Sequence, residues 1–92
     1  MTKPRNIVGP VVRRLRHSRG LTQADLAAKL NLGGWDLARG TLAKIEAGIR
    51  WVADFELVAL ARALGVPPSA LIDPADYGPP AKARSPRIPR RP

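Results

Sequence analysis

Short apolar segments with the period of a helix, each followed by a glycine, constrain the fold of this chain more than any other feature. In residues 8–15, four aliphatic side chains recur at the i, i+3, i+4, i+7 spacing of one helix face, and Gly20 follows them. Comparable segments precede Gly48 and Gly65. No segment alternates convincingly between apolar and polar residues, as a half-buried strand would. The sequence therefore predicts an all-α fold of short helices.

The ends of these helices can be placed from capping residues. Thr22 is a good N-cap, and Asp25 three residues later completes a weaker form of the capping box. Asp54 is expected to cap the helix that follows it. Together these signals predict a compact five-helix bundle. Its expected helices span roughly 8–18, 23–31, at most 37–47, 54–64 and about 68–72.

The core of the bundle must be aliphatic. The chain has 92 residues, 45% of them hydrophobic but only 4% aromatic, and this length suggests one domain. A domain this small buries a limited share of its surface, so each buried side chain matters. The expected core residues are Val8, Val11, Val12, Leu15, Leu26, Ala27, Leu30, Leu37, Leu42, Ile45, Leu57, Val58, Leu60, Ala61 and Leu64.

Positive charge is concentrated at the two ends of the chain. Residues 1–21 carry six Lys or Arg and no acid, and residues 77–92 carry five and no acid. Residues 22–76 carry five bases and seven acids, which leaves a net charge of +9 for the whole chain. Such a distribution favours a polyanionic partner, most simply nucleic acid. The alternative is a basic surface that serves solubility alone.

The composition also suggests a division of the chain. Residues 1–7 form a basic N-terminal arm, and the apolar pattern of residues 8–73 corresponds to the folded domain. Residues 74–92 are rich in proline and base and poor in large apolar groups, so we expect a disordered tail. The tail contains Pro86-x-x-Pro89, which could dock on a protein partner as a polyproline helix.

Several classes of protein are disfavoured. The chain has no cysteine, so it has neither a disulfide framework nor a cysteine-based metal site or nucleophile. Its single histidine, His17, has no nearby nucleophile or paired acid, and we expect no enzyme activity, metal or cofactor. The N-terminus has no apolar signal segment, and no window is long and apolar enough for a membrane span. These features indicate a cytoplasmic protein.

Three motifs in order point to a family. Each motif alone is a weak signal, but together they are specific, because they occur in the family's order and at nearly its spacing. They are "GLTQADLAAKL", "TLAKIEAG" and "LARALGV". Over residues 8–72 the chain resembles the helix-turn-helix proteins of the Cro and phage-repressor type, the XRE family. The resemblance implies a lambda-repressor-like bundle that binds double-stranded DNA. It also implies a bacterial or phage protein of the cytoplasm that associates with the nucleoid. Its third helix would lie in the major groove.

The resemblance also implies roles for individual residues. The base-contacting positions are Arg39, Gly40, Thr41 and Lys44. Arg39 and Lys44 could donate to guanine O6 and N7, whereas Gly40 offers no side chain to read a base. The other interpretation of Arg39 and Lys44 is a solvated charged face.

Phosphate contacts are implied for two positions outside that helix. Gln23 would bind a phosphate at the start of the second helix, and Arg50 would do so beside backbone N–H groups of the loop after Gly48. Glu46 is expected to form a structural ion pair with Arg16. Phosphate contact and plain surface charge are equally good interpretations of the remaining arginines on the first helix, Arg13, Arg14 and Arg19.

The connection between the second and third helices departs from the family pattern. Residues 31–41 separate Leu30 from Leu42, which is longer than usual. We expect an ordered bulge around Gly33 and Gly34, with Trp35 as its apolar anchor. Asp36 could cap the helix that follows. Trp51, in the later loop, could lie along a sugar-phosphate edge of DNA or cover the core, and we expect it to cover the core. The extra length leaves the start of the third helix open.

The functional expectation is a sequence-specific regulator of transcription, a repressor, that binds a two-fold operator as a homodimer. A small patch of Val66, Leu71 and Ile72 is the candidate dimer surface. The alternative is an antitoxin or a coactivator-type module that uses the same fold to bind protein. The two alternatives differ in salt dependence, since binding to several phosphates weakens steeply as salt rises.

Overall fold

The computed structural model describes residues 3–72 and contains four α-helices and a short 3-10 helix. The helices are α1 (Gly9–Ser18), α2 (Gln23–Leu32), α3 (Arg39–Glu46) and α4 (Asp54–Leu64), followed by the 3-10 helix η1 (Pro68–Leu71). No strand occurs between residues 3 and 72. The all-α prediction is therefore confirmed, although the fifth predicted helix is a single 3-10 turn. The tail, 74–92, and its proline motif lie outside the described residues.

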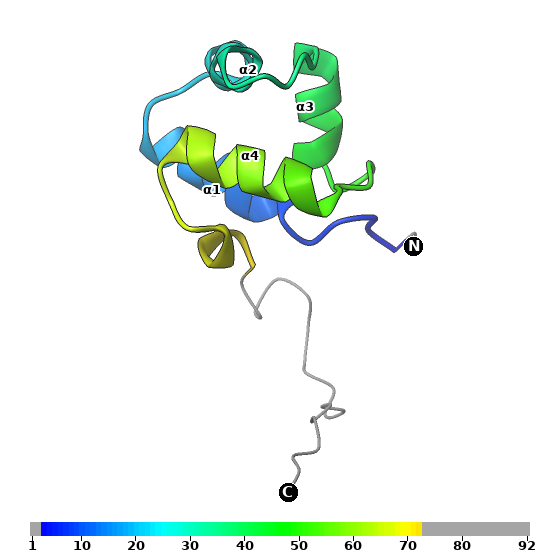
Figure 1. The fold of residues 1–92 in the computed structure, drawn as a ribbon. Helices are drawn as coiled ribbons and strands as arrows, with labels where there is room; N and C mark the ends of the chain where they lie inside the picture. Colours follow the sequence, from blue (N-terminus) through cyan, green and yellow to red (C-terminus); the bar gives the residue numbers. More distant parts are fainter. Residues whose placement is uncertain (1–2, 73–92) are drawn as a thin grey trace, which may run out of the picture.

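The four α-helices pack around one core (Figure 1). α3 packs on α1 and α2, while α4 packs on the same two helices from another side, and η1 packs against α4. In Figure 1, α2 is seen end-on beside the start of α3, and α4 passes in front of α1. One side of α3 is thereby left without a covering helix in this part of the chain.

The start of α2 matches the sequence analysis. Thr22 is the N-cap, and its hydroxyl accepts from the backbone N–H of Asp25 at 3.0 Å. The Asp25 carboxylate accepts in return from the backbone N–H of Thr22 at 2.9 Å, which completes the capping box. Hydrogen bonding to the carboxylate, first from the Thr22 backbone N–H and then from the Thr22 side chain, lowers the pKa of Asp25.

Two predicted caps are wrong. Asp36 does not cap α3, because the helix begins at Arg39 and its N-cap is Ala38, which forms no side-chain cap. Asp54 is already the first residue of α4, after Ala53 as N-cap. The cap at this helix start comes from Glu56, whose carboxylate accepts from the backbone N–H of Ala53 at 3.0 Å. Acidic residues in a first turn and at an N-cap give similar sequence signals, since both positions favour negative charge.

The core is aliphatic, as predicted, and runs through all the helices. Its fully buried members include Val12, Leu26, Leu30, Leu42, Ile45, Leu60 and Leu64. Leu37, which lies in the long connection, is also buried. Val58 is an exception among the predicted core residues, because it is 40% exposed on the outer side of α4.

Two further expectations about apolar side chains are wrong. Trp51 does not cover the core, since 70% of it is exposed, and Phe55 at the start of α4 is exposed as well. Leu71 is completely buried beneath α4 and cannot belong to a surface patch for dimerisation. Only Ile72 and the half-buried Val66 remain of that patch. A turn of 3-10 helix at residues 68–71 directs Leu71 inward.

Helix α1 approaches the end of α3 closely, and Gly9 makes this possible. A Cβ on Gly9 would overlap the carbonyl oxygen of Ile45 and lie 2.9 Å from that of Glu46. The backbones of α1 and α3 therefore touch at this point with no side chain between them. None of the described helices is long and apolar enough to cross a membrane.

Candidate nucleic-acid interface

A buried ion pair joins α1 to the end of α3. Nε of Arg16 donates to Oε2 of Glu46 at 2.7 Å, and Nη2 donates to Oε1 at 3.0 Å. Nη1 of Arg16 also donates to the carbonyl oxygen of Leu21, at 2.8 Å. The two side chains are only 8% and 3% exposed, and hydrogen bonding to Glu46 raises the pKa of Arg16. The structure thus contains the Arg16–Glu46 pair that the resemblance implied.

Gln23 belongs to the same network. Its Nε2 donates to Oε1 of Glu46 at 3.1 Å, so α1, α2 and α3 meet at one carboxylate. The bond fixes the direction of the Gln23 side chain at the start of α2. One N–H of the amide remains for another acceptor, beside the first backbone N–H groups of the helix, which have no intrahelical partner.

The uncovered side of α3 carries the four predicted base-contacting residues. Arg39, Gly40 and Lys44 are exposed, and Thr41 is half-buried. Leu42 and Ile45, on the opposite side, are fully buried. The start of the helix at Arg39 also settles the register that the long connection had left open. A polar, cationic helix face of this kind fits the width of the DNA major groove.

Two surface grooves adjoin this face. The first is lined by Arg39 from α3, Gln23 from α2 and His17 from α1. The second lies at the other end of α3 and includes Lys44. Gln23 and Arg39 thus line a groove at the start of α3, and Lys44 lines a groove at its other end.

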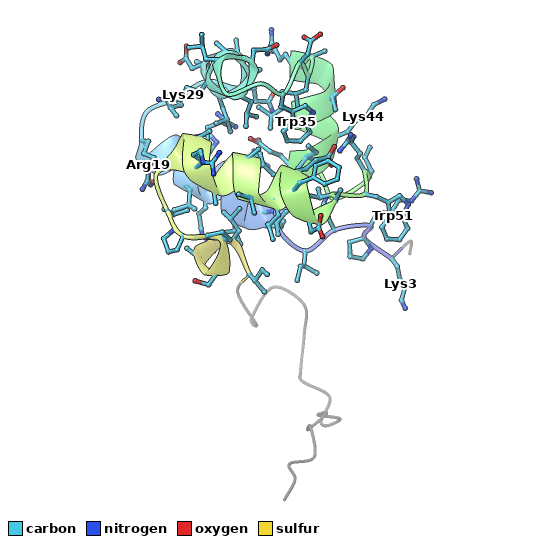
Figure 2. All side chains as sticks on the ribbon, viewed as in Figure 1. Lys3, Arg19, Lys29, Trp35, Lys44 and Trp51 are labelled. Carbon is cyan, nitrogen blue, oxygen red and sulfur yellow. The ribbon has the colours of Figure 1, made fainter. Side chains whose placement is uncertain are left out.

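The arginines of α1 are distributed over a wider area. Arg13 and Arg14 line a separate groove with His17, next to the end of α3. Arg19 donates to the hydroxyl of Ser18 at 3.2 Å. Figure 2 shows Arg19 on the side of the molecule opposite Lys44. The structure thus places Arg13 and Arg14 nearer to α3 than Arg19.

Arg50 has an internal partner. Its Nη1 and Nη2 donate to the two carboxylate oxygens of Glu56 at 3.0 and 3.2 Å, and Nη1 also donates to the carbonyl oxygen of Trp51. The guanidinium lies over the Trp35 ring, 5.8 Å from its centroid, at a distance typical of a cation–π contact. A phosphate contact by Arg50 would have to compete with Glu56.

This contact to Trp35 anchors the long connection. The turn at its start is closed by backbone hydrogen bonds from Gly33 to Lys29, from Gly34 to Asn31 and from Trp35 to Leu30, each between 2.9 and 3.1 Å. Nδ2 of Asn31 spans the connection by donating to the carbonyl oxygens of Ala27 and Leu37. Trp35 is half-buried against the core. The connection is an ordered loop, and Trp35 serves as its apolar anchor.

The backbone N–H groups of Gly48 and Ile49, where α3 meets the loop that follows it, are used internally. Gly48 N–H donates to Ile45 at 2.9 Å, and Ile49 N–H donates to Lys44 at 3.0 Å. These bonds close the end of α3, with Gly48 at φ +78°, where glycine is favoured. The two N–H groups point back into the helix and are not offered to a phosphate.

The Arg50–Glu56 pair makes stability depend on pH. Hydrogen bonds from Arg50, and then from the Ala53 N–H, lower the pKa of Glu56. A lowered pKa in the folded state stabilises the protein above the pKa of the unfolded chain, and this contribution disappears as the pH falls through the folded value.

Replacing Glu56 with glutamine should therefore lower the free energy of unfolding by about 1 kcal/mol at pH 7, the scale of a partly exposed ion pair. The difference between parent and Glu56→Gln should shrink as the pH falls below about 4.3, the usual Glu pKa. Asp25 is present in both proteins, so its titration contributes equally to both free energies of unfolding and cancels in their difference. Urea denaturation at several pH values measures this difference, and a difference that grows toward acid would contradict the assignment.

Sequence reasoning missed the interactions that are formed by distant residues. Asn6 donates through Nδ2 to the carbonyl oxygens of Ile45 and Arg50 and accepts from the N–H of Gly9. Asparagine is a residue type that favours helix starts, so Asn6 carried a local signal, although the N-cap of α1 is Val8. No local pattern could have paired Arg50 with Trp35.

Comparisons with known proteins identify the family of this chain. A sequence profile of the family described as helix-turn-helix matches residues 12–71. The restriction-modification controller protein C.AhdI from Aeromonas hydrophila has a similar structure, with a TM-score of 0.63 and 32% sequence identity. The match covers 72% of this chain and 92% of that one. A comparison with curated proteins returned no match. The chain belongs to the helix-turn-helix family of the XRE type, a family of DNA-binding transcriptional regulators rather than enzymes.

Proposed function

We propose that this protein binds specific sequences of double-stranded DNA, reads the major groove with α3 and represses transcription. The observation that carries the proposal is the exposed face of α3, where Arg39 and Lys44 face outward with the half-buried Thr41 at its edge, opposite the buried Leu42 and Ile45. A fixed helix with cations on its outer face can present donors to the acceptor edges of bases. The likeness to a restriction-modification controller supports a role in gene control.

Sequence is read by few side chains in this proposal. Arg39 and Lys44 donate to guanine O6 and N7, and Thr41 contacts a thymine methyl group or a phosphate. Gly40 lies on the same exposed face and offers no side chain, so one reading position is empty. We therefore expect a modest preference at the base pair that faces Gly40.

In this proposal, residues around α3 bind the DNA phosphates. Gln23 offers its remaining amide N–H next to the first N–H groups of α2, where the helix dipole favours an anion. Arg13 and Arg14 line a groove beside the end of α3 and extend this contact. Arg19 adds attraction from farther away, and Arg50 contributes only if DNA displaces its bond to Glu56.

Repression follows if the bound site overlaps a promoter, since the protein then excludes the transcription machinery. A homodimer on a two-fold operator, with half-sites about one helical turn apart, would supply the affinity that one short helix lacks. We assign no dimer surface, because Leu71 is buried.

Two substitutions separate base reading from phosphate binding. Arg39→Ala should weaken binding to the preferred duplex by about 1–3 kcal/mol and relax the preference at one base pair. Gln23→Ala should weaken binding to all duplexes by a similar factor. Electrophoretic mobility shifts with the preferred duplex and its single-base variants measure both effects.

Lys29→Ala is the matched control, because Lys29 lines a groove between α2 and α4, away from α3. If Arg39→Ala and Gln23→Ala bind every duplex as the parent does, the assigned DNA face is wrong. The alternative function, a protein-interaction module, predicts little salt dependence for its partner, whereas DNA binding through several phosphates predicts a steep one.

A further inference from the structure

The described part of the N-terminal arm, residues 3–7, is fixed against the end of α3 by hydrogen bonds. The backbone N–H of Arg5 donates to the carbonyl oxygen of Gly48 at 2.7 Å. Nδ2 of Asn6 donates to the carbonyl oxygens of Ile45 at 3.0 Å and Arg50 at 2.8 Å, while its Oδ1 accepts from Gly9 at 2.7 Å. Asn6 thus connects the arm, the end of α3 and the following loop.

This attachment builds a cationic groove. Lys3 and Arg5 of the arm line it on one side, and Lys44 of α3 and Ile49 of the loop line it on the other. No acidic side chain lines the groove in the described part of the chain. Figure 2 shows Lys3 and Lys44 on the same side of the molecule, opposite Lys29. Lys44 belongs both to this groove and to the outer face of α3.

The neighbouring arginines of the core and of the loop already have acidic partners. Arg16 is bonded to Glu46, and Arg50 is bonded to Glu56. The backbone N–H groups of Gly48 and Ile49 are bonded within the end of α3. These two N–H groups are therefore occupied, while the arm brings two exposed cations, Lys3 and Arg5, to the same place.

We propose that Lys3 and Arg5 form a phosphate-binding site that extends the DNA interface beyond α3, and that Asn6 positions them. The site would hold the sugar-phosphate backbone of the strand that adjoins the base pairs read by Lys44. Two cations beside Lys44 raise the local positive potential, and the fixed arm limits the entropy lost when a phosphate binds. This inference rests on the proposed function, because it requires that α3 faces DNA.

Salt dependence tests the proposal. The observed association constant falls with salt with a logarithmic slope of about −0.9 for each phosphate contact in duplex DNA. Lys3→Ala/Arg5→Ala should therefore make the slope less negative by about 1.8, if each cation holds one phosphate. Between about 50 and 200 mM salt, the variant should lose roughly tenfold less affinity than the parent loses. Fluorescence anisotropy with the labelled duplex that the parent selects from a random pool measures these slopes.

Lys29→Ala/Arg62→Ala is the matched control. It also removes one lysine and one arginine, from the groove between α2 and α4, so it changes net charge equally. Its slope should stay close to that of the parent. Equal slopes for the two double variants would overturn the arm site, even if Arg39→Ala still relaxes sequence preference. A parent protein that binds no duplex would instead overturn the proposed function, and the arm site with it.

Asn6→Ala tests positioning separately, because it keeps every charge. It should flatten the slope partway toward that of Lys3→Ala/Arg5→Ala, in samples whose circular dichroism matches the parent. A parental slope would show that the arm needs no attachment. If Asn6→Ala fails to fold, ethylation interference is measured with the parent and with Lys3→Ala/Arg5→Ala instead. The double variant should lose interference at the phosphates that flank the site. An unchanged interference pattern would contradict the proposal.

Discussion

Replacing Glu46 with alanine is expected to lower the free energy of unfolding by about 3–5 kcal/mol, because it leaves the guanidinium of Arg16 buried without its partner. Arg16 would lose two of its hydrogen bonds, and Gln23 would lose its bond to the same carboxylate. A small domain is commonly stable by only about 5 kcal/mol at the lower end, so the variant should be close to unfolding at room temperature.

Urea denaturation followed by circular dichroism measures this effect. Removing both charges with Arg16→Met/Glu46→Leu should recover most of the loss, since a well-packed apolar pair often equals a buried ion pair in stability. Glu56→Ala provides the comparison, because its partner Arg50 is 32% exposed and can return to water. If Glu46→Ala costs no more than Glu56→Ala, the Arg16–Glu46 pair does not hold α1 to α3.

Gly9→Ala is expected to destabilise the protein by about 1–3 kcal/mol or more, the usual cost of forcing atoms into a packed interface. The new Cβ would overlap the carbonyl oxygen of Ile45, which is a backbone atom and cannot rotate away. Helix α1 would have to move away from the end of α3, with the arm attached to both. Thermal and urea denaturation measure the loss.

Gly40→Ala is the matched control for this substitution. A Cβ on Gly40 meets nothing within 4 Å, and the residue lies in α3. Alanine should stabilise this helix by about 0.5–1 kcal/mol, because glycine loses more backbone entropy on folding. A Gly9→Ala variant as stable as the parent, or no less stable than Gly40→Ala, would contradict the close packing assigned to Gly9.

The helices could be predicted because their signals are local. The spacing of aliphatic residues and the Thr22–Asp25 box fix α1 and α2 within a residue or two of the observed bounds. Asp36 and Asp54 misled for a physical reason, since an acid near a helix start is favourable at several neighbouring positions. Trp51 misled because a large aromatic residue next to a buried stretch usually packs inward, whereas here the loop turns it outward.

The site could be predicted only where the family motif names residues. The motif points to Gln23, Arg39, Lys44 and Arg50 by position alone, and it also implies the Arg16–Glu46 pair that the structure contains. The partners of Arg50 could not be found, because Trp35, Arg50 and Glu56 come together only after the long connection and α4 have packed. The close approach at Gly9 likewise depends on how two helices cross.

Selection of bound duplexes from a random pool by mobility shift tests the DNA-reading role of α3 most directly. The account predicts a recovered motif with two-fold symmetry, half-sites about one helical turn apart, and guanines at the positions that Arg39 and Lys44 face. The same selection with Arg39→Ala should recover a motif with one position relaxed. A pool that shows no enrichment, or the same motif for parent and variant, would contradict the account.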